Sequence, residues 1–306
     1  MELLTNILAA TVVAGTPLLL VALGELICER SGVLNLGQEG MMLMGAVAGF
    51  VATLSTGSLA AGVAAAILTG MGMALLFGFM AVTLAANQYA AGLALTIFGT
   101  GLSAFAGSGF VGESIEGFER LAIPLLSDIP VIGHALFNQD LLVYFSFFAV
   151  IVISLFLRRS RAGLILRAVG ESPDSANANG LRVLTVRYLA VAFGGAMAGL
   201  AGAYLSLAYT PMWTENMTSG RGWIALALVV FASWRPGRLL LGAYLFGAAS
   251  ILHLVLQGFG WRSPTELLAM LPYAVTILML IFLSFDPVRT RLNTPLSLGQ
   301  PYRPGH

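Results

Sequence analysis

The stretch Ser31-Gly-Val-Leu-Asn-Leu-Gly-Gln-Glu39-Gly40 separates two long apolar runs of the chain. Its three glycines are poor helix formers. If a helix begins near Ser31, Glu39 lies about 12 Å along it, because each residue adds about 1.5 Å. That depth is close to the middle of a hydrocarbon core about 30 Å thick. An ionisable group there costs at least about 2.5 kcal/mol unless it faces protein or a wet cavity, so the stretch predicts an interrupted membrane segment.

The composition shows why a membrane is the expected solvent. Of 306 residues, 58% are apolar and 9% are charged, and the mean hydropathy is +0.89; soluble domains carry roughly a quarter charged residues. At about 20 residues a span, the chain supplies about eight to ten spans. We therefore expect an all-α polytopic membrane protein in which residues 1–306 form a single transmembrane domain. The predicted spans lie near residues 5–27, 39–55, 59–84, 88–110, 141–157, 187–209, 222–234, 238–257 and 267–284.

The placement of arginine orients these spans. Arginines gather in the loop at 158–186, in the turn at 235–238 and after residue 288. Alternating spans put the three regions on one face, which the positive-inside rule makes cytoplasmic. The acidic segment 111–140 falls on the opposite face. The prediction therefore places the N-terminus outside the cell and the C-terminus in the cytoplasm.

A second interrupted segment precedes the seventh span. From Trp223 to Trp234 the chain supplies roughly 18 Å of helix, about 12 Å short of crossing the core. The polar, glycine-containing residues 213–222 must make up the difference. Irregular backbone at membrane depth persists only where it is buried in protein or lines water, and a pair of such segments indicates a transport pathway. Trp213 and Trp223 are expected to be interfacial anchors rather than stacking platforms.

Structural interpretations of the same residues stay open. Asn35 and Asn216 would then cap helices or satisfy free carbonyl groups. Glu39 would form a structural ion pair with Arg30 or Arg221.

Small residues recur every fourth position in two predicted spans, which lets helix backbones approach closely in lipid. They are Gly62, Ala66, Gly70, Ala74 and Gly78 in one span, and Gly195, Gly199 and Gly202 in the other. Two interpretations remain: helix packing within one subunit, or the seam of a dimer.

Several functions are excluded by what the sequence lacks. It contains no lysine, which a Walker-type phosphate loop requires, so the chain cannot be its own P-loop ATPase. The single cysteine, Cys28, cannot form an internal disulfide. Three widely separated histidines show no metal-ligand spacing, so no metal site is expected. A net charge of +1 gives no sign of nucleic-acid binding.

The loop at 158–186 contains a predicted short helix. Ser172 suits its N-cap, Pro173 its first turn and Gly180 its end, while Asp174 complements the helix dipole. Nothing in this loop is typical of catalysis. It is either a solvated connector or a docking helix for a soluble partner.

At these residues the chain resembles permease subunits of ATP-binding-cassette importers, in the superfamily of branched-chain amino acid, simple-sugar and nucleoside permeases. The resemblance rests on residues 24–42, 168–180 and 216–227, and the Glu29-Arg30-Ser31-Gly32-Val33-Leu34-Asn35 form is most like the nucleoside-type branch. Gln38 and Glu171 depart from the common pattern, and the extra N-terminal span of longer members is not seen.

The resemblance implies partners and a location. Such permeases lie in the bacterial inner membrane and pair with a second, homologous or identical, permease subunit. They sit on cytosolic ATPases, which hold ATP and magnesium, so no cofactor is expected on this chain. An extracytoplasmic binding protein, frequently a lipoprotein, delivers the ligand. The Gly170–Gly180 stretch would be the coupling helix.

The resulting hypothesis is a non-enzymatic permease subunit that imports nucleosides or a related sugar-like solute. The residues expected to line or brace the pathway are Asn35, Glu39, Asn216, Thr218 and Arg221. Those expected to couple it to the ATPase are Glu171, Pro173, Asp174, Asn177 and Gly180. A simple sugar or a branched-chain amino acid is the alternative substrate. The alternative mechanism is an autonomous secondary transporter or channel with Glu39 as its ion or proton site. A membrane-embedded enzyme fits worst, because no catalytic residues are recognisable and no nucleophile has a base nearby.

Overall fold

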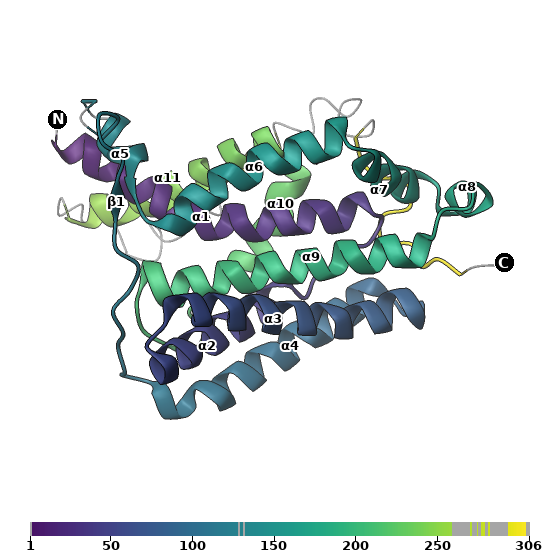
Figure 1. Cartoon of the computed structure of the whole chain (residues 1–306), viewed down its shortest axis with the longest axis horizontal. Helices are drawn as coiled ribbons and strands as arrows, with labels where there is room; N and C mark the ends of the chain where they lie inside the picture. Colours follow the sequence, from purple (N-terminus) through teal and green to yellow (C-terminus); the bar gives the residue numbers. More distant parts are fainter. Residues whose placement is uncertain are drawn as a thin grey trace.

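The computed structural model describes residues 2–127, 129–130, 132–258, 270, 274, 277–278, 281 and 293–303. Most of the predicted ninth span, 267–284, lies outside the described residues. The described chain is a bundle of long, roughly aligned helices with two very short strands (Figure 1). Seven of its helical segments are long and apolar enough to cross a membrane. The protein is therefore an all-α polytopic membrane protein.

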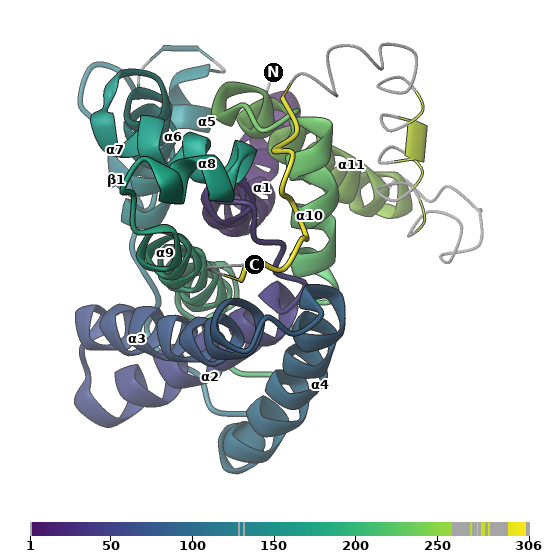
Figure 2. The same ribbon diagram turned by 90° about the vertical axis from the view of Figure 1, so that its right-hand side faces the viewer.

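Helix α1 (Glu2–Arg30) forms the centre of one half of the bundle. It is apolar on all sides, as expected of a helix surrounded by protein, and its residues from Leu18 to Leu23 are almost fully buried. It packs against α9 (Val183–Tyr204), α10 (Arg221–Phe231) and α11 (Pro236–Gly258). Viewed along the bundle, α1 lies inside a ring of other helices (Figure 2).

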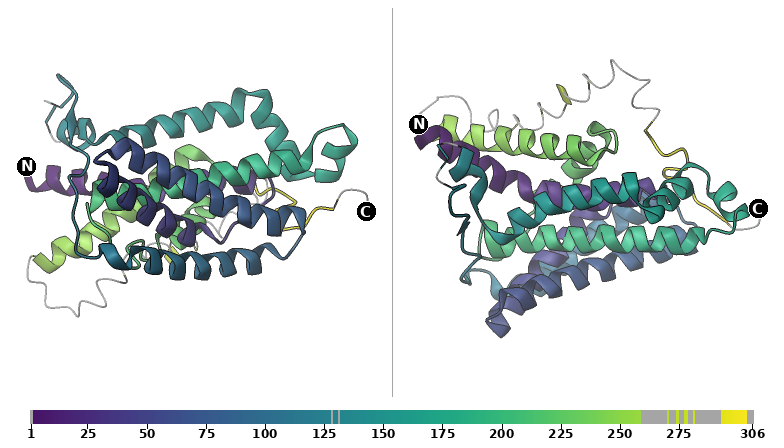
Figure 3. Two further views of the ribbon diagram at one scale, coloured as in Figure 1. Left: turned by 60° about the horizontal axis from the view of Figure 1, so that its bottom comes forward. Right: turned by 45° about the horizontal axis from the view of Figure 1, so that its top comes forward.

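The other half is built from α2 (Gln38–Thr56), α3 (Leu59–Gly78) and α4 (Gln88–Gly107). Helix α9 lies between the two halves and packs on α1, α2 and α3. Two five-residue π-helices, η1 (Phe79–Thr83) and η3 (Leu205–Tyr209), extend α3 and α9. The layered arrangement of these helices is visible from two further directions (Figure 3).

The two rows of small residues face each other within this chain. A Cβ at Gly70 would lie 2.2 Å from the Gly195 carbonyl oxygen, and one at Gly199 would lie 2.1 Å from that of Ala66. Any larger side chain at the centre of the α3–α9 contact would therefore push the two backbones apart. The structure thus shows packing within one subunit for these residues.

A polar segment covers the end of the bundle where α4 finishes. After η2 (Ser108–Phe110), residues 113–118 run beside 207–212, with Ser114 and Met212 forming a β-bridge. Strands β1 (Leu121–Ala122) and β2 (Asn138–Gln139) pair antiparallel around α5 (Ile132–Phe137). The Asp140 side chain then accepts the first N–H groups of α6 (Leu141–Arg159).

The opposite end carries α7 (Arg161–Glu171) and α8 (Pro173–Ala178), so the 158–186 loop is largely helical. The Ser172 hydroxyl accepts the N–H of Ser175, as expected of an N-cap. Residues 293–303 and the α10–α11 turn lie at this same end. The arginine-rich segments of the described chain are therefore together.

Candidate functional site

Two breaks between helices meet in the middle of the bundle. Residues 31–37 link α1 to α2, and residues 210–220 link η3 to α10. The predicted interruption is present: residues 31–37 are not helical, α2 begins at Gln38, and Glu39 lies in its first turn rather than along a helix that begins at Ser31. Mid-depth is nevertheless where Glu39 lies: the next residue, Gly40, packs on Leu95, near the middle of α4. A non-helical segment, rather than two helical turns, carries the chain to that depth.

The carboxylate of Glu39 binds the first turn of α10. Its Oε1 accepts hydrogen bonds from the Thr218 hydroxyl, at 2.5 Å, and from the Gly220 N–H, at 2.7 Å. Its Oε2 accepts the Gly222 N–H at 2.6 Å. The first N–H groups of a helix lack intrahelical partners and carry partial positive charge. Glu39 therefore caps α10 from another helix, which explains how a side chain only 5% exposed stays in this setting.

Backbone shape at the start of α10 allows this contact. A Cβ at Gly222 would lie 2.5 Å from the backbone nitrogen of Glu39. Asn216, Ser219 and Gly220 all have positive φ angles, between 48° and 82°. Glycine adopts such angles freely and asparagine tolerates them. Ser219 is held in this conformation by its N–H and hydroxyl groups, which both donate to the Asn216 carbonyl oxygen.

The Arg221 guanidinium does not pair with Glu39. Its Nη1 donates to the carbonyl oxygens of Met217 and Thr218 at 3.1 and 3.2 Å. Its Cζ lies 5.6 Å from the centre of the Tyr209 ring, within cation–π range. The ion-pair interpretation of Glu39 is therefore wrong as far as Arg221 is concerned.

Trp213 is fully buried and is not an interfacial anchor. It packs beside Val47 and Phe50 of α2, and a Cβ at Gly107 would collide with its indole ring. Its role is to fix the 210–220 segment against α2 and the end of α4. Trp223, in contrast, is 37% exposed.

A second buried carboxylate, Glu25, organises residues 31–38. Its Oε1 accepts the backbone N–H of Asn35 at 2.9 Å, and its Oε2 accepts a hydrogen bond from the Gln38 amide. The side-chain Oδ1 of Asn35 in turn accepts the Gly37 N–H at 2.9 Å. Asn35 thus caps the turn that leads into α2, in agreement with the capping interpretation of this residue. It lies in the Glu25 network and not in the Glu39 contact.

A third carboxylate, Glu29, ties the end of α1 to the α10–α11 turn. Its Oε2 accepts the indole N–H of Trp234 at 2.5 Å, while Oε1 is buried without a hydrogen-bond partner in the described chain. Arg30 donates to the carbonyl oxygens of Trp234 and Asn293, both at 3.0 Å. Arg30 is therefore also occupied elsewhere than at Glu39.

The five predicted pathway residues are only partly brought together. Glu39 contacts Thr218 directly, and Arg221 belongs to the same turn. Asn216 lies in that turn too, but its side chain is exposed. Of the five, Asn216 is exposed and Arg221 is half-buried, whereas Asn35, Glu39 and Thr218 are buried.

Sequence reasoning missed Glu25, Gln38 and the Glu29–Trp234 bond as parts of the site. The available signal was an ionisable residue, Glu25, inside the first apolar run, which by itself marks a functional candidate in a membrane helix. No sequence spacing links Glu29 to Trp234, since 205 residues separate them.

The predicted coupling residues lie at the arginine-rich end, on or beside α8. Four of these residues are exposed and Pro173 is half-buried; the five are Glu171, Pro173, Asp174, Asn177 and Gly180. Ala176 is the buried residue of α8 and packs with Val169 and Val183. Helix α8 therefore has exposed polar side chains on its outer face and is anchored to the protein by the buried Ala176.

Residues 297–302 run between α7 and the α1–α2 connection. The N–H and hydroxyl of Ser297 both donate to the Gly170 carbonyl oxygen, at 3.0 and 2.7 Å. The Gly299 N–H donates to Gly32 at 3.2 Å. Tyr302 packs beneath α8, with the buried Arg187 5.6 Å from its ring centre. This tail segment thus connects the α7–α8 layer to the segment that leads to Glu39.

Comparison with known proteins shows that the sequence is similar to permease components of membrane transport systems. Residues 7–280 match the family described as branched-chain amino acid transport system / permease component. The chain is 44% identical to a putative glucose ABC transporter permease protein of Haloferax volcanii, over 99% of this chain and 98% of the relative. It is 33% identical to a guanosine ABC transporter permease protein of Bacillus subtilis, over 99% and 98%. A nucleoside ABC transporter permease protein of Lactococcus lactis is 32% identical over 90% of both chains.

Proposed function

The chain belongs to the family of permease components of branched-chain amino acid transport systems and is a permease subunit of an ABC transporter; on this premise we propose that it imports nucleosides or a related sugar-like solute. The observation that carries the proposal is the contact, at mid-depth, between the Glu39 carboxylate, directly after the non-helical residues 31–37, and the non-helical end of the segment that leads into α10. Non-helical backbone at that depth supports a solute pathway.

The solute class rests on the relatives and on the polar groups beside the site. Two relatives are named for guanosine or nucleosides and one for glucose. A sugar ring with several hydroxyl groups is common to these solutes. The Asn216 amide and the Arg221 guanidinium are suited to bind hydroxyl groups, since both donate hydrogen bonds. We assign solute contact to these two side chains, and bracing of the pathway to Asn35, Glu39 and Thr218.

The energy source is assigned to partner chains. The sequence has no lysine and hence no Walker motif. In this proposal cytosolic ATPases hold ATP and magnesium, and they push on Glu171, Pro173, Asp174, Asn177 and Gly180. The exposed polar side chains of α8, which Ala176 anchors to the protein, support such a docking role. A second permease subunit and an extracytoplasmic binding protein or lipoprotein complete the assembly in the bacterial inner membrane, with the C-terminus of this chain in the cytoplasm.

The secondary-transporter alternative is less well supported. Both oxygens of Glu39 are already occupied by three donors from α10 and its preceding turn. Binding a cation or proton there would require the α10 N-terminus to lose its cap.

Uptake by proteoliposomes tests the proposal. The complex containing this permease, its ATPase and its binding protein is reconstituted, and radiolabelled guanosine, glucose and leucine are supplied separately with ATP on the ATPase side. We expect ATP-dependent uptake of guanosine or glucose and none of leucine. Uptake by this chain alone under a pH gradient would contradict the proposal and favour the secondary transporter.

A further inference from the structure

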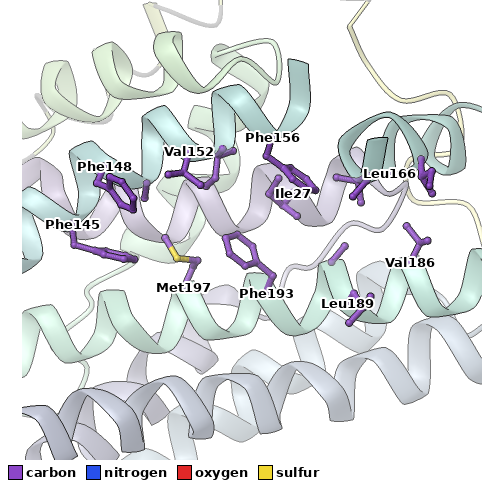
Figure 4. Close-up of a pocket in the computed structure, with 15 residues that line it drawn as sticks. Ile27, Phe145, Phe148, Val152, Phe156, Leu166, Val186, Leu189, Phe193 and Met197 are labelled. Atoms are coloured by element: carbon purple, nitrogen blue, oxygen red, sulfur yellow. The ribbon is translucent and has the colours of Figure 1, made fainter. Parts of the chain in front are cut away.

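An open groove lies between α6 and α9, away from the Glu39 site. Its volume is about 490 Å³, and its lining side chains are all apolar (Figure 4). Helix α1 supplies the floor through Ile27, and α7 closes one end through Leu166. Phe148 and Leu189 line it while remaining 62% and 66% exposed, so the groove opens sideways, to the membrane. An unfilled apolar groove loses the dispersion contacts of its lining, which favours an apolar occupant.

The length of the groove matches one leaflet. Along α6 it extends from Phe145 to Phe156, and along α9 from Val186 to Met197. Eleven residues of helix span roughly 16 Å, about half of a hydrocarbon core about 30 Å thick. A complete transmembrane helix from a partner would need the whole thickness, whereas a single acyl chain occupies one leaflet.

Positive charge lies at the cytoplasmic-loop end of the groove. Arg158 and Arg159 follow Phe156 within the last turn of α6, and Arg161 directly precedes Ala162, another lining residue. All three arginine side chains are exposed. None forms an ion pair within the part of the chain that the structure describes. Arginine at this level is placed to bind lipid phosphate, through a planar fork of N–H donors.

We propose that this groove is a binding site for an anionic phospholipid of the leaflet that faces α7. One acyl chain fills the groove against Ile27, and the headgroup phosphate binds Arg159, which lies two turns after the lining residue Val152 on the same face of α6, together with Arg161. Because Ile27 lies between Glu25 and Glu29 on α1, the bound lipid supports the helix that positions residues 31–38. The site is independent of which solute the protein transports.

Native mass spectrometry of the purified transporter complex tests the site. The complex is equilibrated with equal amounts of phosphatidylglycerol and phosphatidylcholine that carry identical acyl chains. We expect one phosphatidylglycerol retained for each copy of this chain, in preference to phosphatidylcholine. Replacing Arg159 and Arg161 with Gln should reduce retention at least tenfold, since each arginine contributes about fivefold near a membrane surface. The matched control is Arg235→Gln with Arg238→Gln, on the same end but away from the groove, and should retain the lipid.

Groove-filling substitutions provide a second, independent test. Val152→Trp, at the open rim, should displace the lipid, whereas Ile151→Trp, on the exposed neighbouring position outside the groove, should not. Equal retention of the two lipids by the unmodified complex would overturn the proposal. So would undiminished phosphatidylglycerol in the variant that lacks Arg159 and Arg161, or a photo-crosslinker at position 152 that captures a polypeptide in place of lipid.

Discussion

Glu39 accepts three hydrogen bonds within the bundle, and among the residues that the structure describes no other side chain accepts from the same three donors. Glu39→Ala should destabilise the protein by about 2–5 kcal/mol, because two N–H groups and a hydroxyl are left buried without partners. Glu39→Gln keeps one acceptor oxygen and should lose less. The lone cysteine, Cys28, is buried, so a thiol-reactive dye that fluoresces on its exposure reports unfolding during heating. Equal melting temperatures for Glu39→Ala and the unmodified chain would contradict the capping role.

Gly222 permits that contact and should not tolerate a side chain. Gly222→Ala places a Cβ 2.5 Å from the Glu39 backbone nitrogen, which must separate α2 from α10. We expect reduced uptake together with a lower melting temperature. The control is Gly101→Ala in α4, where nothing lies within 4 Å and where alanine should be neutral or favourable. Matching losses in both variants would show that the effect is not specific to the Glu39 contact.

At the scale of elements, the α3–α9 contact depends on its small residues. Gly70→Ala should destabilise the bundle because the new Cβ would lie 2.2 Å from the Gly195 carbonyl oxygen. The control is Gly72→Ala on the same helix, where an added Cβ would have no atom within 4 Å. Dye-monitored melting of the two variants compares them directly. A larger loss at position 72 would be inconsistent with the packing described for α3 and α9.

Substitutions of the exposed residues on and beside α8 should impair coupling to the ATPase without lowering the stability of the protein. Glu171→Arg with Asp174→Arg changes two exposed side chains, so the free energy of unfolding should change by less than about 0.5 kcal/mol for each. If α8 docks onto an ATPase, solute-stimulated ATP hydrolysis in the reconstituted complex should fall sharply. Glu116→Arg with Glu119→Arg, in the acidic segment at the far end, is the charge-matched control. Unaltered hydrolysis in the α8 variant would remove the coupling assignment.

For the molecule as a whole, sidedness follows from which segments share an end. Ser297 binds Gly170 at the α7–α8 end of the bundle, whereas residues 115–118 bind residues 207–211 at the opposite end. We therefore expect residues 177 and 303 on one side of the membrane and residue 116 on the other. Single cysteines at these positions, in a Cys28→Ala background, can be labelled with an impermeant maleimide. We expect positions 177 and 303 to react only in inverted vesicles and position 116 only in right-side-out vesicles. Reaction of 177 and 116 from the same side would contradict the orientation.

Apolar runs and breaker residues were sufficient to predict where most helices of the described chain lie, because lipid requires long apolar helices. The break before α10 was likewise visible as a run too short to cross. The path of residues 31–37 was not, since it depends on Glu25, whose hydrogen bonds to Asn35 and Gln38 exist only after folding. Helix α7 was missed because its amphipathic, arginine-rich sequence is typical of a loop when read by hydropathy alone.

The residues that bind Glu29 and Arg30, at the end of α1, are synthesised long after α1 itself. Trp234, whose indole binds Glu29, is synthesised 205 residues after it, and Asn293, whose carbonyl oxygen binds Arg30, is synthesised 263 residues after it. At ribosomal speeds of roughly 5–20 residues per second, the second interval is about 13–50 s. Until Trp234 is made, the end of the nascent first helix carries a carboxylate and a guanidinium that lack these partners, and Arg30 gains its second partner only with Asn293. Membrane insertion must therefore hold this helix end near water, or against the insertion machinery, until translation has supplied both.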